Sequence, residues 1–270
     1  LANHLIGADT MEVRSHGLPR LLKYVDQTNS GYIDNRATPV TNQLGPALVQ
    51  VDARKNWGIL ALDALVPQLV SLARTHGIAG GSVVNCSHTG RIGAFTEALA
   101  REFMWGQVFG GGGNRKLREV APFGGATGVF DTNPYAFSAP IAPNLVSTSD
   151  FATSATAQGK VLVYRTNRKP LPQGWIIDRD GRPSTDPEGF YDGGALLPSG
   201  GHKGYGMGFI AELFGEAALG VPHELNWFAI AVDLKCFPGA DAYFQRAAVL
   251  RDKIESCPPA EGAERLMWPG

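Results

Sequence analysis

The sequence predicts a mixed α/β or α+β fold, in which strands and helices follow one another irregularly. Helical stripes of apolar residues alternate with short apolar runs typical of buried strands, but not in the regular order of a doubly wound sheet. At 270 residues, with 44% hydrophobic and 18% charged residues, the chain is long enough for one large domain or two modest ones. The 34 glycines and 18 prolines are spread along it and indicate many tight turns.

Charge and cysteine content exclude several classes of protein. The net charge of −1 gives no basic field for nucleic acid or an anionic membrane. The apolar runs are too short, and too often broken by Gly or Pro, to predict a transmembrane helix. Three cysteines without CxxC spacing favour a reducing cytoplasm over a disulfide framework or a zinc site. No signal peptide is visible at Leu1, and we expect the chain to be truncated there.

Two helices are predicted at the start of the chain, over residues 1–9 and from Gly17 to about residue 29. The second helix is expected to carry three apolar side chains on one face, at Leu21, Leu22 and Val25. Residues 32–57 alternate only loosely and contain turn formers. This predicts irregular structure with one strand at 47–51.

The clearest helix spans 59–76, where apolar residues recur at helical spacing and Gly77 provides a stop. Pro67 lies inside this pattern, so we expect the helix to bend there or to start later. A buried strand at 81–85 and a helix at 93–103 are predicted to follow.

The second half of the chain contains strands and two long helices. Strands are expected at 107–109, 135–139, 175–178 and 227–232. The Asp180-Gly181 pair predicts a hairpin turn. Helices are expected at 204–219 and 241–256.

Residues 15–20 read Ser-His-Gly-Leu-Pro-Arg and bring a hydroxyl, an imidazole and a guanidinium to the start of a helix. Reduction of a 2-oxo acid needs a proton donor for the developing alkoxide and a fixed cation for the carboxylate. His16 and Arg20 suit these two roles. A histidine at a helix start is more often a cap or a surface residue, so the motif alone leaves both readings open.

Glycine-rich stretches indicate ligand loops, but not a dinucleotide fingerprint. Residues 110–113 are followed by residues that complete neither G-x-G-x-x-G nor G-x-x-x-x-G-K-[ST]. At 200–208, five glycines surround His202 and Lys203. Backbone there can approach a ligand closely, and Lys203 offers a point charge for phosphate or carboxylate. A plain helix-entry loop is the alternative reading.

Two further loops carry polar side chains. Residues 85–90 lie between a predicted strand and a helix, where N–H groups and His88 can face an anion, unless His88 is an ordinary turn residue. Residues 150–154 are expected to begin a helix capped by Thr153 or Ser154. The sequence contains neither H-E-x-x-H nor G-x-S-x-G, so metal-dependent or nucleophilic catalysis is not expected.

These loops belong to a longer series of motifs that covers nearly the whole chain. The motifs are S-H-G-x-x-R at 15–20, N-C-S-H-T-G at 85–90, V-A-P-F-G-G at 120–125, D-T-N-P-Y-A-F at 131–137, D-F-A-T-S at 150–154, A-Q-G-K at 157–160, L-P-Q-G-W at 171–175 and G-A-L-L-P-S-G-G-H-K-G-Y-G-M at 194–207. With them the chain resembles the malate/L-lactate dehydrogenase family that is unrelated to Rossmann-type lactate dehydrogenases. That family includes ureidoglycolate dehydrogenase, sulfolactate dehydrogenase, diketogulonate reductase and Δ1-piperideine-2-carboxylate reductase.

The resemblance implies a largely antiparallel nucleotide-binding sheet flanked by helices, with a small helical domain and no Rossmann fold. It predicts a nicotinamide-cofactor domain at 46–238. It also predicts an N-terminal helical segment at 1–45 that packs with a C-terminal helix at 239–270. The implied protein is a cytoplasmic homodimer that uses NAD or NADP on a small 2-oxo or 2-hydroxy acid.

The resemblance also implies roles for single residues. His16 is the expected proton donor, with Ser15 setting its hydrogen bonding and Lys160 assisting near the reacting centre. Arg20 is expected to clamp the substrate carboxylate, and Thr132 to face the substrate. The expected cofactor contacts are His88, Thr89, Gly90, Arg91, Ile92, Asp150, Phe151, Ala152, Gly201, His202 and Lys203. No metal is expected.

Three departures from the family pattern are visible. Lys160 stands where the imine-reducing branch is expected to carry an aspartate beside the histidine, which favours a 2-oxo acid substrate. Thr89 replaces a bulkier residue, and relatives carry a longer segment near 221–223. The alternatives are a reductase of a cyclic imine or of a sugar-derived 2-oxo acid, and a non-catalytic nucleotide-binding relative. Five retained motif residues count against the last alternative: Ser15, His16, Arg20, His88 and Lys203.

Overall fold

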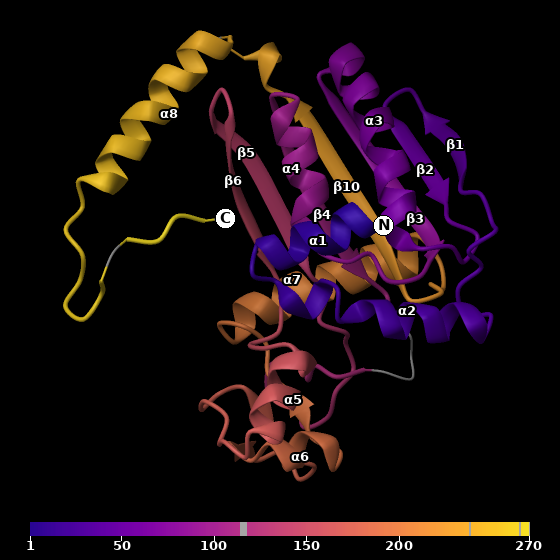
Figure 1. The fold of residues 1–270 in the computed structure, drawn as a ribbon, viewed down its shortest axis with the longest axis vertical. Coiled ribbons are helices and arrows are strands. Elements are labelled where there is room, and N and C mark those ends of the chain that lie inside the picture. Colours follow the sequence, from indigo (N-terminus) through magenta and orange to yellow (C-terminus); the bar gives the residue numbers. More distant parts are fainter. Residues whose placement is uncertain (114–117, 238, 265, 270) are drawn as a thin grey trace.

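A computed structural model describes residues 1–113, 118–237, 239–264 and 266–269 (Figure 1). Its centre is a seven-stranded sheet that runs, from edge to edge, through β1 (Val40–Gly45), β2 (Leu48–Asp52), β3 (Ile78–Cys86), β10 (Leu225–Asp233), β4 (Met104–Gly111), β5 (Tyr135–Ala142) and β6 (Leu145–Phe151). Of the six neighbouring pairs, β2 and β3 run parallel and the other five run antiparallel. The expectation of a largely antiparallel sheet is confirmed.

Helices α3 (Gly58–His76) and α4 (Gly93–Arg101) cover one face of this sheet. The α3 helix begins at Gly58 and continues through Pro67, so a later start is wrong, and Gly77 ends it with φ +81°. Within the described residues, α3 is the one helix long and apolar enough to cross a membrane. Its face at Leu62, Leu65 and Leu69 is instead fully buried in the core against β2, β3 and β10.

Helix α7 (His202–Glu212) and the π-helical turn that follows it (Leu213–Ala218) lie on the opposite face. Neighbouring side chains of β4 point to opposite faces of the sheet. Val108 belongs to the core beneath α3 and α4, whereas Phe109 packs with Ala211 of α7 and with Phe214. The predicted helix at 204–219 is confirmed. A side chain at Gly111 would overlap the Ala211 carbonyl, so glycine permits this close packing.

A smaller lobe lies below the sheet in Figure 1. It contains α5 (Gln158–Thr166), α6 (Pro187–Tyr191) and the short strands β7 (Ile176–Ile177), β8 (Pro183–Ser184) and β9 (Ala195–Leu196). The predicted hairpin turn joins β7 to β8, with Gly181 at φ +78°. A separate apolar core fills the lobe, made of Val120, Val161, Leu171, Ile176, Phe190 and Leu196.

The structure corrects the predicted helix start at 150–154. Strand β6 runs to Phe151, and α5 begins only at Gln158. The hydroxyls of Thr153 and Ser154 donate to the carbonyls of Thr132 and Thr156, at 2.9 and 2.7 Å. They are therefore internal links and cap no helix.

The N-terminal helices are α1 (Ala2–Thr10) and α2 (Arg20–Asn29), joined through a 3₁₀ turn at Arg14–His16. Leu21, Leu22 and Val25, the apolar side chains expected on one face of α2, are exposed. Leu22 is 77% exposed, whereas Tyr24 is only 1% exposed and faces the core. A stripe of apolar residues on a short helix does not say which face the rest of the chain covers.

Helix α8 (Ala240–Glu255) follows the last strand. Its first turn packs Tyr243 and Phe244 on Phe103, and the Tyr243 hydroxyl donates to the Pro140 carbonyl at 2.9 Å. Beyond that turn the helix extends away from the sheet (Figure 1). The domain division at residues 45 and 239, with the packing of the two ends, stays a prediction.

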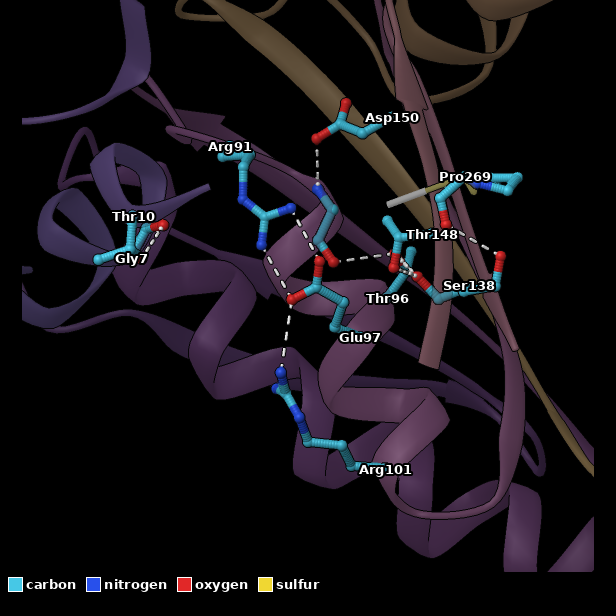
Figure 2. A network of polar contacts seen from close by, with 12 residues as sticks. Gly7, Thr10, Arg91, Thr96, Glu97, Arg101, Ser138, Thr148, Asp150 and Pro269 are labelled. Atoms are coloured by element: carbon cyan, nitrogen blue, oxygen red, sulfur yellow. Dashed lines mark hydrogen bonds and ion pairs between the residues drawn. The ribbon is translucent and has the colours of Figure 1, made fainter. Parts of the chain in front are cut away.

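A buried ion pair and a chain of hydroxyls hold α4 on the sheet (Figure 2). The Arg91 guanidinium donates to both carboxylate oxygens of Glu97, at 2.8 and 2.9 Å, and both residues are 8% exposed. The Thr96 hydroxyl lies 2.7 Å from that of Ser138, which lies 2.9 Å from that of Thr148. These contacts tie the first turns of α4 to β5 and β6.

We expect Glu97→Gln to lower the free energy of unfolding by about 3–5 kcal/mol, because the buried Arg91 loses its counter-charge. Chemical denaturation measures this. The matched control is Glu188→Gln, which breaks a bidentate pair with Arg165 at 2.8 Å on the exposed surface and is expected to change stability little. Equal losses in the two variants would contradict the expectation.

Two glycines in α7 give a second matched pair. A Cβ at Gly204 would lie 2.4 Å from the Ser199 carbonyl oxygen and 2.5 Å from that of Thr153, whereas a Cβ at Gly206 would meet nothing within 4 Å. Gly204→Ala is expected to cost about 1–3 kcal/mol through overpacking. Gly206→Ala is expected to gain up to about 1 kcal/mol through helix propensity. Thermal unfolding of both variants tests the difference in sign.

Candidate active site

His16 ends the 3₁₀ turn between α1 and α2 and is half-buried. Its Nδ1 lies 2.9 Å from the Ser15 hydroxyl oxygen, and its ring stacks on His88 with the centroids 5.4 Å apart. Burial, and then the charges of Arg20 and His4, lower the pKa of His16 to about 4. At neutral pH this imidazole is therefore uncharged.

Arg20 begins α2, and its Nε donates to the Ser15 carbonyl at 2.7 Å. This bond fixes the guanidinium beside the His16 turn. Among the ion pairs of the described residues, none includes Arg20, so the two terminal nitrogens are free to bind a carboxylate. The first turn of α5 also approaches this turn, because a Cβ at Gly159 would lie 3.9 Å from that of Ser15. Lys160, the next residue, is exposed.

The loop after β3 brings His88 to the same place. The Tyr24 hydroxyl oxygen lies 2.7 Å from His88 Nδ1, and the Gly90 N–H donates to that nitrogen at 3.1 Å. Gly90 has φ +68°, and a side chain there would overlap the His4 ring. In the described parts of the chain, no three His, Cys, Asp or Glu side chains are placed to hold a metal ion, these histidines included.

The next predicted cofactor residues lie beside this loop but are partly engaged within the protein. The charge of Arg91 is bound by Glu97, while Thr89 and Ile92 are buried. Asp150 accepts the Gly93 N–H at 2.7 Å through Oδ2, at the start of α4. Phe151 and Ala152 follow at the end of β6, where Phe151 is exposed.

Thr153 joins three of the predicted loops. Its N–H and its hydroxyl both donate to the Thr132 carbonyl, at 2.9 Å each. Its own carbonyl accepts the Ser199 N–H at 2.8 Å. The Thr132 hydroxyl donates to Asp131 Oδ1 at 3.2 Å. The structure thus brings Thr132, the end of β6 and the start of α7 together, and Asp150 at the end of β6 bonds the start of α4, directly after the loop of His88.

The loop before α7 offers an open backbone and a free charge. Gly200 and Gly201 have φ of +60° and +63°, and a Cβ at Gly201 would lie 3.1 Å from the Phe123 ring. The His202 ring meets the same phenyl ring edge-on, at 6.2 Å between centroids. Lys203 takes part in no ion pair among the described residues. A glycine cradle, an exposed aromatic ring and an unpaired cation fit a nicotinamide dinucleotide, which carries both phosphates and aromatic rings.

Sequence reasoning missed the polar groups behind these loops. Tyr24 was not predicted as a site residue, because only the apolar residues of its helix were considered. Its spacing of four residues from Arg20 is the one signal in the sequence that could have identified it. Burial and then Asp131 raise the pKa of Glu119 to about 7, and burial raises that of Glu224, which accepts the Tyr32 hydroxyl at 3.4 Å. No sequence motif identifies either carboxyl group. Only the fold brings Glu119 near Asp131 and Glu224 near α2.

Comparison with known proteins identifies the family of this chain. The sequence model of the malate/L-lactate dehydrogenase family matches residues 1–270. Δ1-pyrroline-2-carboxylate reductase 1 of Burkholderia ambifaria is 36% identical over 220 residues, which are 82% of this chain and 63% of that protein. The chain thus spans less than two thirds of that curated relative.

Solved structures show the same fold. Δ1-piperideine-2-carboxylate reductase from Pseudomonas syringae superposes with a TM-score of 0.87 at 30% identity, over 99% of this chain and 82% of that one. Sulfolactate dehydrogenase from Methanocaldococcus jannaschii superposes with a TM-score of 0.87 at 26% identity, over 99% and 80%. The chain therefore belongs to the malate/L-lactate dehydrogenase family.

Proposed function

We propose that this protein is an NAD- or NADP-dependent oxidoreductase that interconverts a small 2-oxo acid and the corresponding 2-hydroxy acid. The observation that carries the proposal is the turn at 15–20. It holds an uncharged imidazole at His16, hydrogen-bonded to the Ser15 hydroxyl, beside an unpaired guanidinium at Arg20, hydrogen-bonded to the Ser15 carbonyl. A 2-oxo acid needs a guanidinium at its carboxylate and, once the imidazole is protonated, a proton donor at its carbonyl oxygen.

The cofactor, when bound, supplies or accepts the hydride at C2 of the substrate. The residues proposed to hold it are the loop at 88–92, the end of β6 at 150–152 and the loop at 201–203. Gly90 and Gly201 give these loops their left-handed backbone, at φ +68° and +63°, and Lys203 offers a charge to a phosphate.

Arg20 binds the substrate carboxylate in two parallel hydrogen bonds and so sets which face of C2 is presented. His16 donates a proton to the oxygen of C2 during reduction and takes it back during oxidation. A carboxylate at Arg20 offsets one of the charges that lower the pKa of His16. Substrate binding therefore favours the protonated imidazole that reduction requires. Thr132 is proposed to face the substrate.

A cyclic imine with a 2-carboxylate is the second candidate substrate, because two of the relatives above are named as reductases of such imines. Lys160 argues against it. A protonated imine is a cation, which the ammonium of Lys160 repels, whereas the developing alkoxide of a 2-oxo acid is an anion that it attracts. A sugar-derived 2-oxo acid stays within the leading proposal.

The test is consumption of NADH and NADPH with a panel of 2-oxo acids and cyclic imines. Turnover of a 2-oxo acid is expected, and Lys160→Asp is expected to shift kcat/KM toward imines by about tenfold. Lys169→Asp, an exposed charge change just after the C-terminal end of α5, serves as the control. Turnover of imines alone would overturn the leading proposal. If neither NADH nor NADPH is consumed with any substrate, the result would favour a non-catalytic nucleotide-binding relative.

His16→Ala is expected to lower kcat by about 10²–10⁴-fold in both directions, because general acid–base catalysis is lost. His76→Ala, at the exposed end of α3, is the matched control and should retain wild-type turnover. Full activity in His16→Ala would refute the assigned role.

We also propose that the protein acts as a homodimer in the cytoplasm. The exposed apolar face of α2 and the projecting helix α8 support a second copy, since both carry large apolar side chains in solvent: Leu21, Leu22, Val25, Val249 and Leu250. Three free cysteines suit a reducing compartment. Sedimentation velocity is expected to show twice the monomer mass, and Leu22→Glu is expected to reduce it. A monomer at micromolar concentration would contradict the dimer.

A further inference from the structure

His88 is held by two hydrogen bonds at one ring nitrogen. The Gly90 amide nitrogen lies 3.1 Å from Nδ1, and the Tyr24 hydroxyl oxygen lies 2.7 Å from the same atom. Because a backbone amide can only donate, Nδ1 accepts and carries no proton. The Tyr24 hydroxyl must then donate as well, and the ring proton lies on Nε2.

Tyr24 reaches His88 because of its place on α2. Arg20 and Tyr24 are four residues apart and therefore lie on the same face of the helix. Tyr24 is buried, with its ring centroid 5.8 Å from that of His88. One face of α2 thus presents the carboxylate-binding cation and, one turn later, the group that supports His88.

The surroundings keep this pair neutral. Burial lowers the pKa of His88 well below its usual value and raises that of Tyr24 to about 12, so the phenol keeps the proton that it donates. The groups that act on the pair come from α1, the 3₁₀ turn, α2 and the residue before β10. They are His4, His16, Arg20, Lys23 and Glu224. Apart from Glu224, which acts on Tyr24, all of them disfavour a second proton on His88.

We propose that Tyr24 is a positioning residue that fixes His88 as a neutral imidazole with its proton on Nε2. His88 then serves the site as a hydrogen-bond donor, and His16 alone exchanges a proton. The inference rests on the proposed function. The His88 ring stacks on His16, so a charge on His88 would lie directly against the proton-exchanging imidazole. A neutral His88 leaves His16 free to change charge when an anion binds at Arg20.

The first test measures the imidazole protons and needs no turnover. In the whole chain labelled with ¹⁵N-histidine, NMR is expected to show His88 protonated at Nε2 from about pH 5 to pH 8. Tyr24→Phe removes one donor, so the Nδ1 resonance should shift toward that of a free imidazole nitrogen. Tyr243→Phe, which loses a hydroxyl bound to the Pro140 carbonyl, should leave His88 unchanged.

Two results of this test would overturn the proposal. One is a wild-type His88 that carries its proton on Nδ1 or gains a second proton within that pH range. The other is a His88 spectrum that does not change in Tyr24→Phe. The wild-type spectrum decides the protonation state even where a variant fails to fold.

The second test separates positioning from proton transfer. Tyr24→Phe is expected to lower kcat by about tenfold and to change KM little, because Arg20 still binds the carboxylate. His88→Gln keeps a nitrogen donor that cannot titrate. It is expected to turn over faster than His88→Ala and to keep the shape of the wild-type pH profile. Loss of one limb of that profile in His88→Gln would show that His88 exchanges a proton, against the proposal. A wild-type protein without turnover would refute the proposed function, and the NMR result would still decide the role of Tyr24.

Discussion

The tight turn between β3 and α4 is the constraint on which the rest of the site depends. No side chain has room at Gly58, where a Cβ would lie 2.4 Å from the Ser87 carbonyl oxygen, or at Gly90, where it would meet the His4 ring. The turn is therefore packed between α3 on one side and α1 on the other. A buried ion pair at its end, between Arg91 and Glu97, ties it to α4. These contacts fix the position of His88, which lies in this turn.

The charge distribution around this turn suits an anionic ligand. Arg20 and Lys203 take part in no ion pairs within the described residues, while the buried Arg91 is neutralised by Glu97. The nearby histidines His4 and His16 have pKa values lowered to about 4, so they add no positive charge at neutral pH. Arg20 and Lys203 thus keep a free positive charge for the carboxylate and the phosphate of the proposed ligands, and the imidazoles of His4 and His16 stay neutral.

Sequence patterns predicted the buried elements well and the exposed ones poorly. Helix α3 was predicted because its stripe of leucines packs on three strands, and β10 because it is buried between β3 and β4. The edge strands β1 and β6 were missed, since their largely exposed residues leave no apolar alternation to detect. The hydroxyls at 153–154 were misread as a helix cap, because the partners that they bond lie 21 residues away for Thr153 and outside any helix for Ser154.

The sequence by itself determined which side chains are candidates for the site. Local motifs marked His16, Arg20, His88 and Lys203, and the resemblance of the whole series of motifs to one family gave them their expected roles. The tertiary structure decided which of these groups are free and which are engaged. It showed Arg91 paired with Glu97, Asp150 bound at the start of α4, and Tyr24 hydrogen-bonded to His88 from 64 residues away. Such pairings depend on distances between elements remote in the chain, and no local pattern encodes them.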